Sequence, residues 1–182
     1  MRPVTIMLAL ILGLVLAQSN NYFPNGVGFS WVYSSGEEQA FAREKDGLLV
    51  LEHRYNGRSR YADLLRYDPT GVYLEGVYIG GATQKYNPPL QLYPSAPLII
   101  GQEWGMKSSI QGKIVAFVAK VTRLEGIQVP AGKFNAYVIR TSFVTQSGGS
   151  SVVESYFVPG VGVVRFVGAD GSKVDLVKFV RP

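Results

Sequence analysis

Hydrophobic and polar residues alternate with a period of two along most of this chain. The pattern is clear at residues 137–143, where Tyr137, Ile139 and Phe143 are separated by partly polar neighbours. This period is typical of a β-sheet with one solvated face. No apolar pattern at helical spacing continues for three turns. The sequence therefore predicts an almost entirely β-sheet protein.

Turn sequences divide the alternating pattern into short segments. Most contain Gly beside Asp, Asn or another Gly, which supplies the positive φ that a tight hairpin needs. They are Asp46-Gly47, Asn56-Gly57, Gly80-Gly81, Ser147-Gly148-Gly149 and Asp170-Gly171. The strands expected between the turns cover residues 37–45, 48–55, 59–67, 72–79, 103–109, 110–124, 134–146, 150–158, 162–167 and 172–180.

These segments predict one all-β domain, a single antiparallel meander of about ten strands. The meander is expected to form a curved sheet, a half-barrel or a sandwich. Helical structure is expected to be limited to short turns, for example at residues 130–132. Residues 114–119 are apolar at every position, which predicts a strand with both faces covered.

The segment at residues 86–101 has a different character. Its four prolines cannot donate hydrogen bonds to a sheet, so we expect a long proline-rich loop and not a strand. The loop is too apolar for a solvated linker, and it either covers one end of the sheet or acts as a lid. The candidate lid residues are Leu90, Leu92, Tyr93, Leu98 and Ile99.

The N-terminus has the features of a secretory signal peptide. Arg2 precedes an apolar run that ends in Val15-Leu16-Ala17, the small-residue pattern of a cleavage site. The run is shorter than the ~20 residues that span a bilayer as a helix. We therefore expect residues 1–17 to be removed, leaving residues 18–182 as a single β domain in the periplasm or secreted.

Composition excludes several kinds of chemistry. The chain has no Cys, so it can form neither disulfides nor thiolate metal sites. Its net charge of +5 allows weak association with anionic surfaces, but the basic residues are scattered and predict no nucleic-acid binding. No motif predicts a metal ion or another cofactor.

Catalytic candidates are few. His53 is the one histidine, and no Gly-x-Ser-x-Gly elbow accompanies it, so we interpret it as a partly buried structural residue. A two-residue turn at Asn56-Gly57 would place it opposite Arg60, which disfavours an imidazolium. Three carboxylates lie among apolar neighbours and are interpreted as rim or ion-pair residues: Glu75, Glu103 and Glu154. We expect no catalytic residues and no enzyme.

Aromatic side chains are the strongest indication of binding. They bury large areas and keep a polar tip, so exported proteins use them to line ligand pockets, although β cores contain them as well. The candidate ligand-lining residues are Trp31, Tyr33, Tyr73, Tyr78, Trp104 and Tyr156.

Several motifs together resemble a broad group of uncharacterised exported bacterial β-rich proteins. They are Tyr22-Phe23-Pro24, Gly28 and Trp31-Val32-Tyr33, then Val129-Pro130-Ala131-Gly132-Lys133-Phe134, then the hairpin from Glu154 to Val164 that contains Pro159-Gly160-Val161-Gly162. By looser analogy of fold, such proteins look like the LolA and LolB periplasmic lipid carriers. That resemblance implies an apolar ligand cradled by a curved sheet.

Three functions are consistent with these features. The first is a non-enzymatic envelope protein that binds an apolar or amphiphilic small molecule, or another envelope protein, on a curved sheet. The second is a structural or assembly module of the cell surface. The third is a carboxylate-dependent glycan hydrolase.

Overall fold

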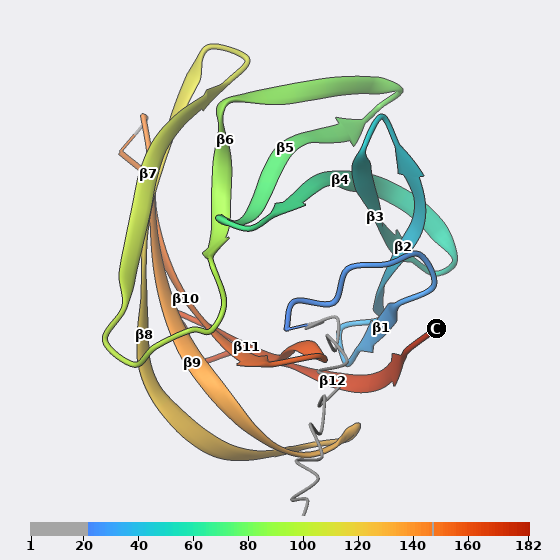
Figure 1. The fold of residues 1–182 in the computed structure, drawn as a ribbon, viewed down its shortest axis with the longest axis vertical. Coiled ribbons are helices and arrows are strands. Elements are labelled where there is room, and N and C mark those ends of the chain that lie inside the picture. The colour runs from blue at the N-terminus through green and yellow to red at the C-terminus, as the bar shows by residue number, and fades with distance from the viewer. Residues whose placement is uncertain (1–21, 147) are drawn as a thin grey trace, which may run out of the picture.

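The computed structural model describes residues 22–146 and 148–182, and the predicted signal peptide lies outside the described residues. In this part of the chain all regular structure is β (Figure 1). The strands are β1 (Ser30–Tyr33), β2 (Glu37–Lys45), β3 (Leu48–Tyr55), β4 (Arg58–Asp68), β5 (Gly71–Ile79), β6 (Ala82–Pro94), β7 (Glu103–Ile110), β8 (Lys113–Val129), β9 (Gly132–Thr145), β10 (Ser150–Val158), β11 (Gly162–Gly168) and β12 (Lys173–Val180).

The strands form a closed antiparallel barrel in which each strand pairs with its neighbours in the chain. The barrel closes between the first and last strands, where Trp31 of β1 pairs with Phe179 of β12 and also with Gln39 of β2. The prediction of an all-β meander was right, but the expected open sheet, half-barrel or sandwich of about ten strands was wrong. Closure removes both exposed sheet edges, which would otherwise pair with other chains.

Two-residue turns join several of the hairpins. Asp46 and Gly47 both have positive φ, as do Asn56 and Gly57, which is the geometry of a type I′ turn. A third pair, at residues 111–112, has the same geometry and separates β7 from β8, two residues later than we predicted from the sequence. Of the predicted turn at residues 147–149, Ser147 lies outside the described residues.

Two further predictions about local structure were wrong. Residues 86–94 belong to β6, so the proline-rich segment is a loop only from residue 95 to residue 102. The prolines are tolerated because they lie where β6 has little ladder pairing with β7. Residues 130–131 form the β-turn between β8 and β9 and not a helical turn. No helix in the described ranges has the length and apolar character needed to cross a membrane.

The core lies inside the barrel, and the strands alternate between it and solvent. In β8, Phe117, Ala119 and Val121 are buried, whereas Val118 between them is 57% exposed. The prediction that both faces of residues 114–119 are covered was therefore wrong. The apolar residue at 118 lies on the outer surface, where nothing among the described residues covers it.

In the view of Figure 1, the N-terminal segment before β1 lies within the ring of strands (blue). Phe23 stacks on Tyr93 with ring centroids 5.0 Å apart, and it also contacts Phe157. The hydroxyl of Tyr67 donates to the carbonyl oxygen of Pro24, at 3.0 Å. These contacts join β4, β6 and β10 through one segment.

Candidate functional site

The barrel interior contains an apolar cavity of about 430 Å³. Its walls come from β6 to β11, and β1 to β5 contribute none of its lining residues. No charged residue lines it, and its size lies in the range of pockets for small organic ligands. The lining residues are Leu90, Leu92, Tyr93, Trp104, Phe117, Ala119, Ile139, Thr141, Phe143, Val153, Ser155 and Phe166.

Strand alternation explains why these residues meet. Ser155 of β10 pairs with Ile139 of β9, and Val153 pairs with Thr141, so all four lie on one face of the sheet. Thr141 and Ser155 are diagonal neighbours and bring two hydroxyl groups into an otherwise apolar wall. Neither hydroxyl forms a hydrogen bond with another described residue.

The cavity borders the two neighbouring strands that share the fewest ladder pairs in the barrel. The β6 and β7 strands share just two ladder pairs, Tyr86 with Ile110 and Asn87 with Ser109. Beyond them, side chains hold the strands together. Trp104 Nε1 donates to the carbonyl oxygen of Leu92 at 3.2 Å, and Ser108 Oγ donates to that of Pro88 at 2.5 Å.

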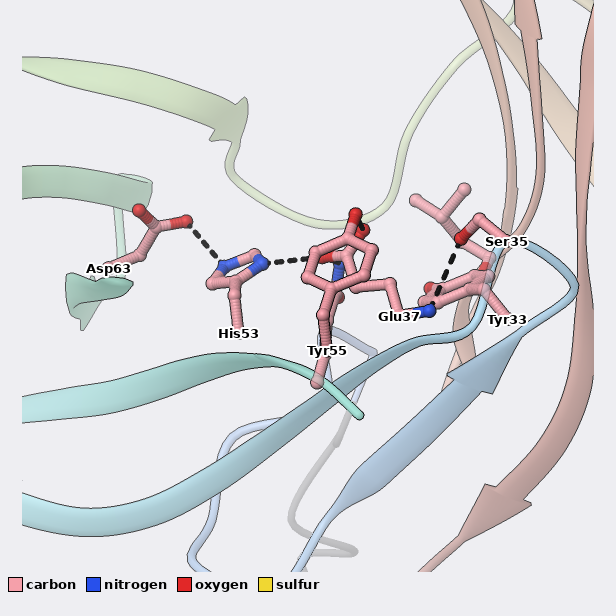
Figure 2. A network of polar contacts seen from close by, with 8 residues as sticks. Tyr33, Ser35, Glu37, His53, Tyr55 and Asp63 are labelled. Carbon is pink, nitrogen blue, oxygen red and sulfur yellow. Dashed lines mark hydrogen bonds and ion pairs between the residues drawn. The ribbon is translucent and has the colours of Figure 1, made fainter. Parts of the chain in front are cut away.

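The opposite half of the interior carries a polar cluster instead of a cavity (Figure 2). His53 of β3 lies between two carboxylates. Its Nδ1 is 2.7 Å from Glu37 of β2, and its Nε2 is 3.1 Å from Asp63 of β4. Tyr55 donates to the second oxygen of Glu37, and the ring of Tyr61 stacks on the imidazole at 4.1 Å. The cluster therefore links three adjacent strands.

The cluster holds a charged histidine. Burial alone would lower the pKa of His53, but hydrogen bonds to Asp63 and Glu37 outweigh it and raise this pKa to about 9. The hydrogen bond from His53 is the main reason that the pKa of Glu37 falls to about 2. Both ring nitrogens then donate protons to carboxylates. The expectation that Arg60 would face His53 was wrong, because a bulge places Tyr61 there.

Tyr33 connects the cavity side with the polar side. Its ring lies 5.7 Å from that of Phe166, which lines the cavity, and its hydroxyl donates to the carbonyl oxygen of Val163. Burial is the largest cause that raises the pKa of Tyr33, and Tyr93 and Glu37 add to it. Tyr33 therefore lies near residues of both regions.

Comparison with known proteins leaves the family open. No protein-family model matches the chain, and no curated protein matches it. A candidate exported protein with a YmcC-like fold from Bacteroides fragilis is similar over 88% of this chain and 99% of its own, with 12% identity and a TM-score of 0.49.

Two further solved structures are similar to this chain. A candidate lipoprotein from Parabacteroides distasonis has 12% identity and a TM-score of 0.44, with 87% of this chain and 98% of its own covered. The hypothetical lipoprotein YmcC from Escherichia coli has 10% identity and a TM-score of 0.38, with 85% and 83% covered. All three are described as exported proteins or lipoproteins, and with TM-scores below 0.5 they carry no argument about this chain.

The aromatic residues that the sequence indicated as ligand-lining do not form one site. Trp104 alone among them lines the cavity. Trp31 is a core residue whose Nε1 donates to the carbonyl oxygen of Val161. Tyr33 is also a core residue and makes the contacts described above. Tyr73 lies under the guanidinium of Arg66 on the outer face. Tyr78 is 44% exposed on that face, and Tyr156 accepts a hydrogen bond from Arg123.

The candidate lid residues are divided between wall and loop. Leu90, Leu92 and Tyr93 belong to β6 and form part of the cavity wall. Leu98 is buried in the β6–β7 loop, where its backbone N–H donates to the hydroxyl of Tyr22. Ile99 is 63% exposed. Three of these residues therefore surround the cavity as a fixed wall, and none of the five covers it as a separate loop.

The three carboxylates considered for catalysis each form an ion pair, as the sequence analysis expected. Glu75 pairs with Arg66 at 2.6 Å, Glu103 with Lys120 at 2.5 Å, and Glu154 with Arg123 at 3.5 Å. None of the three lines the cavity. No group of metal-ligating side chains occurs among the residues described.

The sequence indicated four residues of the cavity wall, Leu90, Leu92, Tyr93 and Trp104, and it did not indicate the others or the carboxylate partners of His53. Thr141, Phe143 and Ser155 belong to ordinary alternating strands, and their shared position depends on the order of strands around the barrel. Glu37 and Asp63 lie on the two strands that were predicted to flank the strand of His53. Two carboxylates on these flanking strands were a signal that His53 could have acidic partners. The bulge between His53 and Arg54 concealed that arrangement.

Proposed function

We propose that this protein is an exported, non-enzymatic envelope protein that holds an apolar or amphiphilic molecule inside its barrel. The cavity bordered by β6 to β11 is the observation that carries this proposal. Its walls are almost entirely aromatic and aliphatic, and binding would remove these surfaces and those of the ligand from water.

The lining residues also limit the ligand's chemistry. A charged group buried there would find no counter-ion, because Lys, Arg, His, Asp and Glu are absent from the lining. The hydroxyls of Thr141 and Ser155 are available to one uncharged polar group, such as a carbonyl or hydroxyl. The part of the ligand inside the barrel is therefore mainly hydrocarbon and electrically neutral.

Native mass spectrometry of protein purified from its own envelope tests the proposal. We expect a mass increment that disappears after extraction with organic solvent and returns when the extract is added back. A Thr141→Phe variant should fill the cavity and lack the increment, whereas Ser142→Phe should retain it because residue 142 points to the outer face. Wild-type protein that carries and takes up nothing would contradict the proposal.

A second candidate function, an assembly module of the cell surface, is favoured by one observation. Val118 and Val144 are 57% and 51% exposed on the outer faces of the neighbouring strands β8 and β9. An exposed apolar patch of this kind is a candidate protein contact. Light scattering over a concentration series should show self-association that Val118→Ser abolishes, and a monomer at every concentration would argue against a contact between copies.

A further inference from the structure

A second hollow lies on the outer surface over β2 to β6. Its volume is about 450 Å³, and it shares no lining residue with the inner cavity. The residues that line it are Arg43, Lys45, Asp46, Leu48, Val50, Leu64, Tyr78, Thr83 and Lys85. Unlike the inner cavity, this hollow combines an apolar floor with charged side chains.

One row of paired residues builds the hollow across five strands. Arg43 pairs with Val50, Val50 with Leu64, Leu64 with Gly76, and Gly76 with Lys85. Directly paired residues place their side chains on the same face of a sheet. The row is therefore cationic at both ends and apolar in the middle, and its ends are about 19 Å apart at about 4.8 Å per strand.

The row lies on the outside of the barrel. Leu49 and Leu65 are part of the inner core, so their neighbours Val50 and Leu64 point the other way. Gly76 contributes no side chain and leaves space between Leu64 and Lys85. A Cβ at this position would lie 2.6 Å from the backbone oxygen of Gln84, so the close approach of β6 requires glycine.

Positive charge exceeds negative charge around the hollow. Arg43 is paired with Glu52 at 2.8 Å, but neither Lys45 nor Lys85 forms an ion pair with another described residue. Asp46 is the one acidic residue among those that line the hollow. Two ammonium groups are therefore available beside an apolar floor.

We propose that this outer hollow binds an organic anion. The apolar body of the ligand lies over Leu64 beside Tyr78, and its phosphate or carboxylate pairs with Lys45 or Lys85 at one end of the hollow. A neutral apolar molecule would desolvate both ammonium groups without a partner, whereas an anion gains charge-assisted hydrogen bonds as well as apolar contact. This site is additional to the proposed carrier function and does not depend on it.

Two dyes with the same aromatic body separate the outer site from the inner cavity. The anionic dye is 1-anilinonaphthalene-8-sulfonate, and N-phenyl-1-naphthylamine is its uncharged counterpart. The double variant Lys45→Gln/Lys85→Gln should bind the anionic dye about tenfold more weakly, because no ammonium group remains at either end of the hollow to pair with the sulfonate. Its affinity for the uncharged dye should stay unchanged.

The control variant is Lys107→Gln/Lys178→Gln, which removes the same charge from exposed positions on β7 and β12. Equal loss of the anionic dye in both double variants, or no loss in Lys45→Gln/Lys85→Gln, would overturn the proposal. Vesicles containing phosphatidylglycerol then identify the source of the anion. Weaker vesicle binding by Lys45→Gln/Lys85→Gln assigns a lipid headgroup, and loss confined to the dye assigns a small soluble anion.

Discussion

The two sides of the barrel interior differ in the side chains that occupy them and in how completely they are filled. On the β2–β4 side, inward positions are occupied by Glu37, His53 and Asp63, which satisfy one another by hydrogen bonds. On the β6–β11 side, inward positions are apolar and leave a cavity of about 430 Å³. One side is complete without a ligand, and the other has unfilled volume.

This difference separates stability from binding. A buried, fully hydrogen-bonded charge cluster fixes the register of three strands but offers little space. An incompletely filled apolar wall loses dispersion contacts that a ligand can restore. We therefore expect substitutions on the polar side to change folding stability and substitutions on the cavity side to change binding.

Loss of a carboxylate from the polar cluster should have the largest effect on the free energy of unfolding. Glu37→Ala removes a carboxylate that His53, Tyr55 and Gln39 all contact, and it leaves the imidazolium with one partner. We expect the free energy of unfolding to fall by about 3 kcal/mol, the range for a broken buried ion pair. Urea denaturation measures this change. Glu38→Ala, at the exposed neighbouring position, is the control and should have almost no effect.

The charge on His53 also predicts how the stability of the folded protein depends on pH. Its folded-state pKa of about 9 lies above the ordinary value of 6.5, so its stabilisation is fully present below pH 6.5 and is lost as pH rises through 9. The pKa of Glu37 is depressed, so its contribution is present above pH 4.5 and is lost as pH falls towards 2.

We therefore expect maximal stability between pH 4.5 and 6.5 and a loss of about 3 kcal/mol by pH 9.5. Urea unfolding of wild-type protein and of His53→Gln across this range measures the loss. The variant should show no such decline above pH 6.5. A wild-type profile that is flat from pH 6 to 9.5 would mean that His53 is not held as an imidazolium.

Most of the strands could be predicted because their signals are local. Asp46-Gly47 and Asn56-Gly57 specify tight turns by their own backbone preferences, and β2 and β3 begin and end at the predicted residues. The turn at Gln111-Gly112 adopts the same geometry with Gln in place of Asn or Asp at its first position, so the local signal is weaker there. Closure by pairing of Trp31 with Phe179 depends on residues far apart in the chain and has no local signal.

The β6 strand and the polar cluster could not be predicted from the sequence, for two different physical reasons. Pro88 and Pro94 predict a break, yet β6 forms because β5 supplies ladder partners such as Leu74 for Leu90. His53 was interpreted as a partly buried structural residue, and the structure shows it buried and hydrogen-bonded. Its charge was missed because the bulge after it shifts the register by one residue, which exchanges Arg60 for Tyr61.

Hydrogen exchange can test how firmly β7 is held to β6 beside the cavity. Amides of residues 103–108 that point towards β6 have almost no ladder partners there. Amides of residues 115–121 lie in β8, which pairs with both β7 and β9. We expect the first group to exchange roughly a hundredfold faster, because local opening costs less free energy there. Equal protection in both groups would show that side-chain contacts between β6 and β7 protect these amides as well as ladder hydrogen bonds do.

The smallest expected effect concerns single hydroxyl groups. Thr141→Val should change the free energy of unfolding by less than about 0.5 kcal/mol, because this hydroxyl has no hydrogen-bond partner among the described residues. Thr122→Val removes a hydrogen bond to the carbonyl oxygen of Val138 and should cost about 1 kcal/mol. Denaturant titrations of the two variants compare them directly. Equal costs would indicate that Thr141 is already satisfied within the fold.

The proposed function requires that an apolar molecule binds inside the barrel, on the β6–β11 side. Fluorescence titration with uncharged N-phenyl-1-naphthylamine measures this binding in wild-type protein and in the matched variants Thr141→Phe and Ser142→Phe. We expect saturable binding to wild type and to Ser142→Phe, and no binding to a folded Thr141→Phe. Undiminished binding to Thr141→Phe, or no binding to wild type, would show that the barrel interior is not the ligand site.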